Sequence, residues 1–189
     1  MEESRHVFIR AGLRPLLAAD PTTVTVLEMG FGTGLNALLV RLLAREFPET
    51  HFHYVSYERY PISATQLAGL NYPEQLGVDR RLLEELHRPG VQNYPGENFD
   101  LDLRMEDFLM ALTGGEADVI FYDAFAPNAQ PELWTTEAME HCYAALREGG
   151  WLVTYCAQGQ FKRNLRAAGF RVEALPGPPG KREMTRGGR

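Results

Sequence analysis

Residues 24–36 read Val-Thr-Val-Leu-Glu-Met-Gly-Phe-Gly-Thr-Gly-Leu-Asn, and this stretch decides the fold. The run from Val24 to Leu27 is β-branched or apolar, which is typical of a buried strand. Three glycines at alternate positions follow, and an apolar helical segment begins at Leu35. Glycine permits backbone angles and a close ligand approach that a Cβ atom prevents. A strand, a glycine loop and a helix N-terminus in this order predict a binding site for a nucleotide-like ligand. A glycine-rich turn without a ligand is the alternative.

Length and composition indicate an ordinary globular protein of one domain. The chain has 189 residues, of which 44% are hydrophobic and 23% are charged. No apolar run reaches the roughly 18 residues of a membrane-spanning helix, and the N-terminus lacks the apolar segment of a signal peptide. The two cysteines, Cys142 and Cys156, lack the spacing of metal ligands, so we expect buried thiols in a reducing compartment. These features predict a cytoplasmic enzyme without a bound metal.

Charge is distributed unevenly along the chain. The net charge is −6, but residues 160–189 hold eight Lys or Arg side chains against two Glu, a local charge of +6, and the rest of the chain carries −12. A basic end on an acidic body favours local binding of a polyanion. A solvated tail explains the same charge equally well.

Strand and helix patterns alternate along the chain. We expect strands over 24–27, 51–58, 99–105, 117–123 and 151–156. Helices are expected over 35–47, 61–70, 80–86, 108–112, 131–146 and 160–168, and residues 170–174 and 182–185 are expected to pair as closing strands. This alternation predicts an α/β fold with a mostly parallel sheet, helices on both faces and an antiparallel C-terminal strand.

Acidic residues stand where these strands end. The ligand of an open parallel sheet lies beyond the carboxyl ends of its strands. Glu58 is placed to accept hydrogen bonds from both ribose hydroxyls of a nucleoside, and Glu28 to orient the glycine loop or an amino group of the ligand. Asp107, followed by Phe108, is placed to accept from an adenine amino group. A helix N-cap or a surface acid is the alternative for Glu58, and the N-cap of the helix expected over 108–112 is the alternative for Asp107.

Asp123 is the sharpest candidate for catalysis. It ends the apolar strand Val-Ile-Phe-Tyr at 119–122 and precedes the loop 124–131, which reads Ala-Phe-Ala-Pro-Asn-Ala-Gln-Pro. A carboxylate at this position would face both a bound cofactor and the incoming substrate. A turn-capping Asp is the alternative.

Four motifs together resemble one family. The glycine spacing is G-x-G-x-G, which differs from the dinucleotide pattern G-x-G-x-x-G and is usual in adenosylmethionine-dependent methyltransferases. In order along nearly the whole chain, residues 28–36, 56–61, 122–127 with Pro131 and Trp134, and 180–184 resemble the methyltransferase domain of the MnmC family of bifunctional tRNA-modifying proteins. Gln130 stands where the family motif has Asn.

The resemblance implies a Rossmann-like class I fold, with one methyltransferase domain over 1–189 that lacks the family's upstream segment and its oxidase domain. It also implies S-adenosyl-L-methionine as cofactor and methylation of 5-aminomethyl-(2-thio)uridine at the wobble position, in the anticodon loop of tRNA. The predicted cofactor-binding residues are Glu28, Gly30, Phe31, Gly32, Thr33, Gly34, Asn36, Glu58, Arg59, Asp107 and Phe108. The predicted catalytic residue is Asp123, and the predicted substrate-binding residues are Phe125, Pro127, Trp134, Lys181 and Arg182.

Two other functions remain open from the residues alone. An aminopropyltransferase of the polyamine-synthase type also binds a sulfonium and uses an Asp at a strand end to activate an amine. The acidic body suits a polyamine, whereas the basic C-terminal segment does not. A catalytically silent module that binds adenosylmethionine or RNA is the second alternative.

Overall fold

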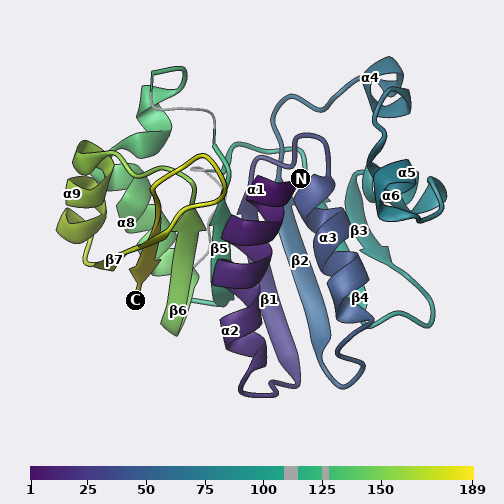
Figure 1. Cartoon of the computed structure of the whole chain (residues 1–189), viewed down its shortest axis with the longest axis horizontal. Coiled ribbons are helices and arrows are strands. Elements are labelled where there is room, and N and C mark those ends of the chain that lie inside the picture. Colours follow the sequence, from purple (N-terminus) through teal and green to yellow (C-terminus); the bar gives the residue numbers. More distant parts are fainter. Residues whose placement is uncertain (109–114, 125–127) are drawn as a thin grey trace.

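The computed structural model describes residues 1–108, 115–124 and 128–189. These residues form one eight-stranded sheet with the order β3-β4-β2-β1-β5-β6-β8-β7 (Figure 1). The strands are β1 Thr23–Met29, β2 His51–Tyr57, β3 Gly90–Asn93, β4 Phe99–Arg104, β5 Ala117–Tyr122, β6 Leu146–Thr154, β7 Arg171–Pro176 and β8 Glu183–Gly188. The five central strands, from β4 to β6, are parallel. β3 and β8 run antiparallel to them, and β7 pairs antiparallel with β8. The predicted α/β class and the antiparallel C-terminal pair are confirmed, whereas the edge strand β3 was not predicted.

Helices cover both faces of the sheet, as the sequence predicted. They are α3 Leu35–Ala44, α4 Ala64–Ala68, α5 Tyr72–Leu76, α6 Arg81–Leu86, the 3₁₀ helix η2 Pro131–Trp134, α8 Thr136–Ala145 and α9 Gly159–Ala167. Alternate residues of β5 enter different cores: Phe121 joins the apolar cluster under α3, and Ile120 joins the one under α8 and α9. Both faces of the sheet are therefore buried at β5.

The helix expected over 35–47 ends at Ala44, and two other predicted helices differ more in their limits. The helix expected over 61–70 is the shorter α4, because Ser63 and Gln66 form a capping box that starts it. The helix expected over 131–146 is divided at Thr135, whose side chain accepts a hydrogen bond from Ala138 N and starts α8. The short α5 was not predicted. Of the helix expected over 108–112, only Phe108 lies within the described residues.

An N-terminal helical segment that the sequence analysis did not predict packs on the sheet. It consists of α1 Glu2–Ser4, the π-helix η1 Arg5–Leu13 and α2 Arg14–Leu17, and it crosses β5 and β6 beside α3 (Figure 1). The segment packs tightly against β6 at Gly12, because a Cβ atom on this residue would lie only 2.8 Å from Val153 Cγ2. Trp151 Nε1 donates a hydrogen bond to Gly12 O at 2.8 Å. This segment brings its first residues to the carboxyl ends of the strands.

The two cysteines are buried, as predicted, and burial raises the pKa of the Cys156 thiol. Across the described part of the chain, every helix is too short or too polar to cross a membrane.

Candidate active site

A cavity of about 690 Å³ opens at the carboxyl ends of β1, β2, β4 and β5. Its floor is the glycine loop between β1 and α3. Gly30 and Gly32 lie at φ +83° and +54°, in the left-handed region that favours glycine, and a Cβ atom on Gly32 would point into open space. A ligand can therefore reach the backbone of this loop. Nine of the eleven predicted cofactor-binding residues line the cavity: Gly30, Phe31, Gly32, Thr33, Asn36, Glu58, Arg59, Asp107 and Phe108.

Glu58 ties the glycine loop to the end of β2. Its Oε2 accepts a hydrogen bond from Gly32 N at 2.8 Å, and its Oε1 accepts one from Tyr60 N at 2.7 Å. A carboxylate has about four lone-pair sites, so each oxygen keeps one free for a ligand. The predicted contact with ribose hydroxyls is compatible with this geometry and stays a prediction.

Glu28 and Gly34 are not part of the cavity wall. Gly34, at φ +71°, precedes α3, and a Cβ atom there would lie 3.0 Å from the Phe31 ring. Glu28 is 1% exposed and lies beneath the floor. Its carboxyl group accepts hydrogen bonds from Asn36 Nδ2 and Ser56 Oγ, both at 2.9 Å. Burial raises the pKa of Glu28 to about 8, although these two hydrogen bonds lower it. In this structure Glu28 orients Asn36.

Asn36 connects Glu28 to the predicted catalytic carboxylate. Its Nδ2 also donates to Asp123 Oδ2 at 3.0 Å. Asp123 keeps exposed surface because it faces the open cavity, yet burial on its other sides raises its pKa. The hydrogen bond from Asn36 opposes this shift. Asn36 Oδ1 is buried and has no hydrogen-bond partner among the described residues.

The aromatic and acidic residues after β4 form another wall. Phe108 is buried edge-on against Tyr57, with 5.6 Å between the ring centroids. Asp107 forms an ion pair with Arg59 at 3.2 Å, and both line the cavity. This pair closes the cavity between the ends of β2 and β4, where the sequence analysis placed a nucleoside.

Three distant segments meet at the mouth of the cavity. Lys181, in the loop between β7 and β8, forms an ion pair with Glu3 of α1. Its Nζ lies 4.4 Å from the centroid of the Tyr155 ring, and the Tyr155 hydroxyl donates to Ala124 O at 2.7 Å. Tyr155 therefore supports the backbone next to Asp123. Local sequence patterns carry no signal for Tyr155 or Glu3, because their roles arise only from long-range contacts.

The other predicted substrate-binding residues lie in different environments. Trp134 is 4% exposed and packs edge-on against Tyr122 and Phe161 in the core, while its neighbour Leu133 lines the cavity. Its predicted contact with a base stays a prediction, and its position supports the cavity wall from behind. Arg182 is exposed beside Lys181. Phe125 and Pro127 lie outside the described residues.

Ion pairs partly neutralise the basic C-terminal region. Lys162 pairs with Glu183 at 2.7 Å, and Arg186 pairs with Glu173 at 2.6 Å. The cation at the cavity mouth, Lys181, is held by an acid from the other end of the chain.

Comparisons with known proteins agree with this site. Residues 80–189, more than half of the chain, match the family described as S-adenosyl-L-methionine-dependent methyltransferase. The bifunctional protein MnmC of Methylobacillus flagellatus, named for tRNA 5-methylaminomethyl-2-thiouridine biosynthesis, is 33% identical over 99% of this chain and 31% of its own length. The MnmC protein of Pseudomonas fluorescens is 34% identical over 99% of this chain and 30% of its own length. The chain thus spans about a third of these relatives.

Two solved structures share the fold of this chain, with very different degrees of similarity. The crystal structure of MNMC2 from Aquifex aeolicus superposes with a TM-score of 0.81 at 26% identity, over 98% of this chain and 60% of that one. Spermidine synthase from Thermotoga maritima has a TM-score of 0.54 at 18% identity, over 97% of this chain and 57% of that one, which shows a shared fold alone. The resemblance to the MnmC family is confirmed, and methyl transfer is favoured over aminopropyl transfer. The chain belongs to the S-adenosyl-L-methionine-dependent methyltransferases.

Proposed function

We propose that this chain methylates the exocyclic amine of 5-aminomethyl-(2-thio)uridine at the wobble position of tRNA. One observation carries the proposal: 99% of the chain aligns, at 33% identity, with a protein named for tRNA 5-methylaminomethyl-2-thiouridine biosynthesis. The methylaminomethyl group in that name is the product of adding one methyl group to an aminomethyl group. Asp123, facing the cavity, is an acid suited to activating an amine.

The residues around the cavity fit S-adenosyl-L-methionine. The glycine loop leaves its backbone open to a ligand, and Glu58 retains lone pairs for ribose hydroxyls. The cofactor supplies an activated methyl group on a positively charged sulfur. The protein must then chiefly align a nucleophile toward that methyl group.

Asp123 can accept the proton that keeps an alkylamine substrate from acting as a nucleophile. An amine of this type has a pKa near that of Lys, about 10.4, so near neutral pH it is an ammonium without a lone pair. The Asp123 carboxylate accepts a proton from the nitrogen, and the freed lone pair becomes the nucleophile. Burial raises the pKa of Asp123 and thereby makes it a better base, while Asn36 holds it in position. The open cavity lets the proton pass to solvent.

The mouth of the cavity suits an RNA loop. Lys181 and Arg182 stand beside it on the loop between β7 and β8, where they would contact phosphates. A wobble base lies in a loop, from which a base can be splayed out and stacked on side chains. The predicted contacts of Phe125, Pro127 and Trp134 with that base belong to this proposal, as does a location in the cytoplasm with the tRNA.

The test is a methyl-transfer assay on tRNA that carries the unmethylated aminomethyl group. The protein is incubated with S-adenosyl-L-methionine and this tRNA, and the nucleosides are separated by liquid chromatography with mass detection. We expect a 5-methylaminomethyl nucleoside to form on this tRNA, and no further methyl group to be added to tRNA that is already methylated. Putrescine with decarboxylated adenosylmethionine is run in parallel. Tight cofactor binding without methylated tRNA would contradict the proposal, and aminopropyl transfer to putrescine would replace it.

A further inference from the structure

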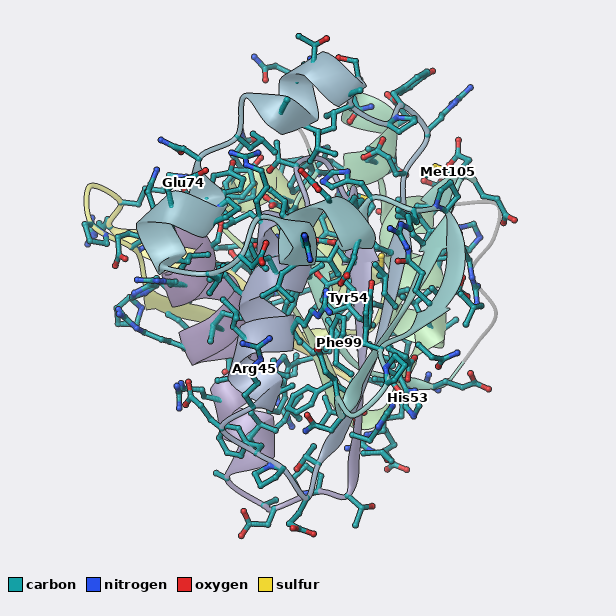
Figure 2. The ribbon with its side chains drawn as sticks, turned by 90° about the vertical axis from the view of Figure 1, so that its right-hand side faces the viewer. Arg45, His53, Tyr54, Glu74, Phe99 and Met105 are labelled. Atoms are coloured by element: carbon teal, nitrogen blue, oxygen red, sulfur yellow. The ribbon has the colours of Figure 1, made fainter. Side chains whose placement is uncertain are left out.

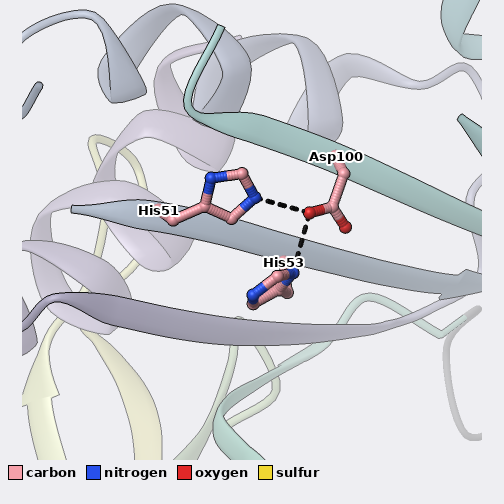
Figure 3. Close-up of side chains that lie close together, drawn as sticks. All are labelled: His51, His53 and Asp100. Atoms are coloured by element: carbon pink, nitrogen blue, oxygen red, sulfur yellow. Dashed lines mark hydrogen bonds and ion pairs between the residues drawn. The ribbon is translucent and has the colours of Figure 1, made fainter. Parts of the chain in front are cut away.

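Three side chains gather at the other end of the sheet from the cavity. His51 and His53 lie on β2, and Asp100 lies on β4 (Figure 3). At about 3.3 Å per residue, His53 is roughly 13 Å from the carboxyl end of β2 at Tyr57. The cluster is therefore separate from the cofactor site. Only the spacing of the cysteines was considered as a sequence signal for metal ligands, so this cluster was not predicted.

The strand geometry brings these side chains to one face. Residues two apart on a strand project from the same side, and Asp100 is the register partner of His53 in the parallel pair of β2 and β4. The alternate residues Tyr54 and Phe99 are buried in the core on the side of α3 (Figure 2). His51, His53 and Asp100 thus share the opposite, partly uncovered face, with side chains 40%, 46% and 19% exposed.

Their ligand atoms converge on one point. Asp100 Oδ1 lies 2.6 Å from His51 Nε2 and 2.7 Å from His53 Nδ1 (Figure 3). All three potential ligand atoms lie within 4.8 Å of one another. One carboxylate oxygen therefore faces two imidazole nitrogens, and a single cation could be coordinated by all three atoms.

We propose that His51, His53 and Asp100 form a binding site for a divalent transition-metal ion of the zinc type. Two imidazole nitrogens and one carboxylate oxygen are donors that Zn²⁺ accepts, whereas Mg²⁺ and Ca²⁺ prefer oxygen ligands. With metal–ligand distances of about 2.0–2.2 Å, tetrahedral ligands stand about 3.4 Å apart. The two present nitrogen–oxygen distances need to open by less than about 1 Å, which side-chain rotation supplies.

The exposed side of the cluster completes the site. Three protein ligands leave a fourth tetrahedral position, which water fills. Because the imidazoles are partly exposed, the ion has a path from solvent. Bound there, it would link β2 to β4 and stabilise the fold without touching the cofactor cavity.

The test is titration of the tag-free full chain with zinc chloride by isothermal calorimetry, after treatment with a chelator. We expect one equivalent to bind with micromolar affinity and the unfolding temperature to rise by a few degrees. The variants His53→Ala and Asp100→Asn should bind about tenfold more weakly or worse. His141→Ala, which removes an exposed histidine on α8, is the matched control and should bind zinc like the parent. Magnesium chloride should give no heat of binding at this site.

Imidazole NMR signals locate the ion independently of the variants. Zinc should shift the signals of His51 and His53 and leave that of His141 in place. Circular dichroism verifies that each variant is folded before titration. Two results would overturn the proposal: zinc affinity equal in the parent and in a His51→Ala/His53→Ala double variant, or no saturable binding by the parent. Neither result bears on methyl transfer, so this site and the proposed function are tested separately.

Discussion

Asn36 donates a hydrogen bond to Asp123, with 3.0 Å between Nδ2 and Oδ2. Asn36 lies in the first turn of α3, directly after the glycine loop, and its amide also contacts the buried Glu28. The backbone that receives the cofactor and the carboxylate that faces the substrate are therefore joined through one side chain. We expect changes at these three residues to have distinguishable effects on turnover, on the pH dependence of methylation and on stability.

Replacement of Asp123 separates catalysis from cofactor binding. Asp123→Asn keeps the size of the side chain but removes the proton acceptor, so we expect turnover to fall by about 10²-fold or more. Affinity for S-adenosyl-L-methionine, measured by calorimetry, should change by only a few-fold. Glu132→Gln, which removes another acid of the cavity wall, is the control and should retain most of its turnover. Unchanged turnover in Asp123→Asn would remove this residue from the mechanism.

Asn36→Ala should change the pH dependence of methylation. The hydrogen bond from Asn36 lowers the pKa of Asp123 and partly opposes the effect of burial. Without that bond the pKa of Asp123 rises, so the acidic limb of the plot of kcat against pH should move to higher pH. The reaction is measured across pH 5–9 with saturating cofactor. An acidic limb that stays in place in a folded variant would show that Asn36 does not tune this carboxylate.

Glu28→Gln should alter how stability depends on pH. Burial raises the pKa of Glu28 from 4.5 to about 8, so the folded protein holds a proton there that the unfolded chain releases above pH 4.5. Stability from this group is present below pH 4.5 and is lost as the pH rises through about 8. Relative to the parent, the Gln variant should gain roughly 3–5 kcal/mol between pH 4.5 and pH 8. Urea unfolding at several pH values measures the difference, and parallel curves would contradict it.

Charge reversal at the cavity mouth tests the contact with RNA. The double variant Lys181→Glu/Arg182→Glu should bind tRNA more weakly, and its deficit should be larger at low salt than at high salt, because phosphate contacts are screened. Binding is measured by filter retention at several salt concentrations. Arg45→Glu, at the far end of α3 (Figure 2), is the matched control and should bind tRNA like the parent. Equal deficits at all salt concentrations would argue against phosphate contacts.

Tyr155→Phe tests how the loop beside Asp123 is held. The change removes the hydrogen bond to Ala124 O at 2.7 Å but keeps the ring beneath Lys181. A typical hydrogen bond is worth about 1 kcal/mol, so we expect kcat to fall about fivefold with little change in tRNA affinity. A fall in tRNA affinity alone would instead assign Tyr155 to substrate binding.

Much of the cavity could be predicted from local sequence. The carboxyl ends of parallel strands meet at one edge of a sheet, so the acids at the ends of successive strands had to lie close together. Glu58, Asp107 and Asp123 do so around the cavity. The glycine loop could also be predicted, because glycine is the residue that most readily adopts the positive φ angles found there.

The tertiary structure alone decided the rest. Only the packing showed that Glu28 lies beneath the floor of the cavity and that Trp134 lies in the core behind the cavity wall. The sequence determined which residues form strands, turns and caps, because those preferences act within a few positions. Which distant side chains meet, as Glu3 meets Lys181 and His53 meets Asp100, was decided by the packing of the whole sheet. Contacts between residues far apart in the chain depend on strand order and register, which no local pattern encodes.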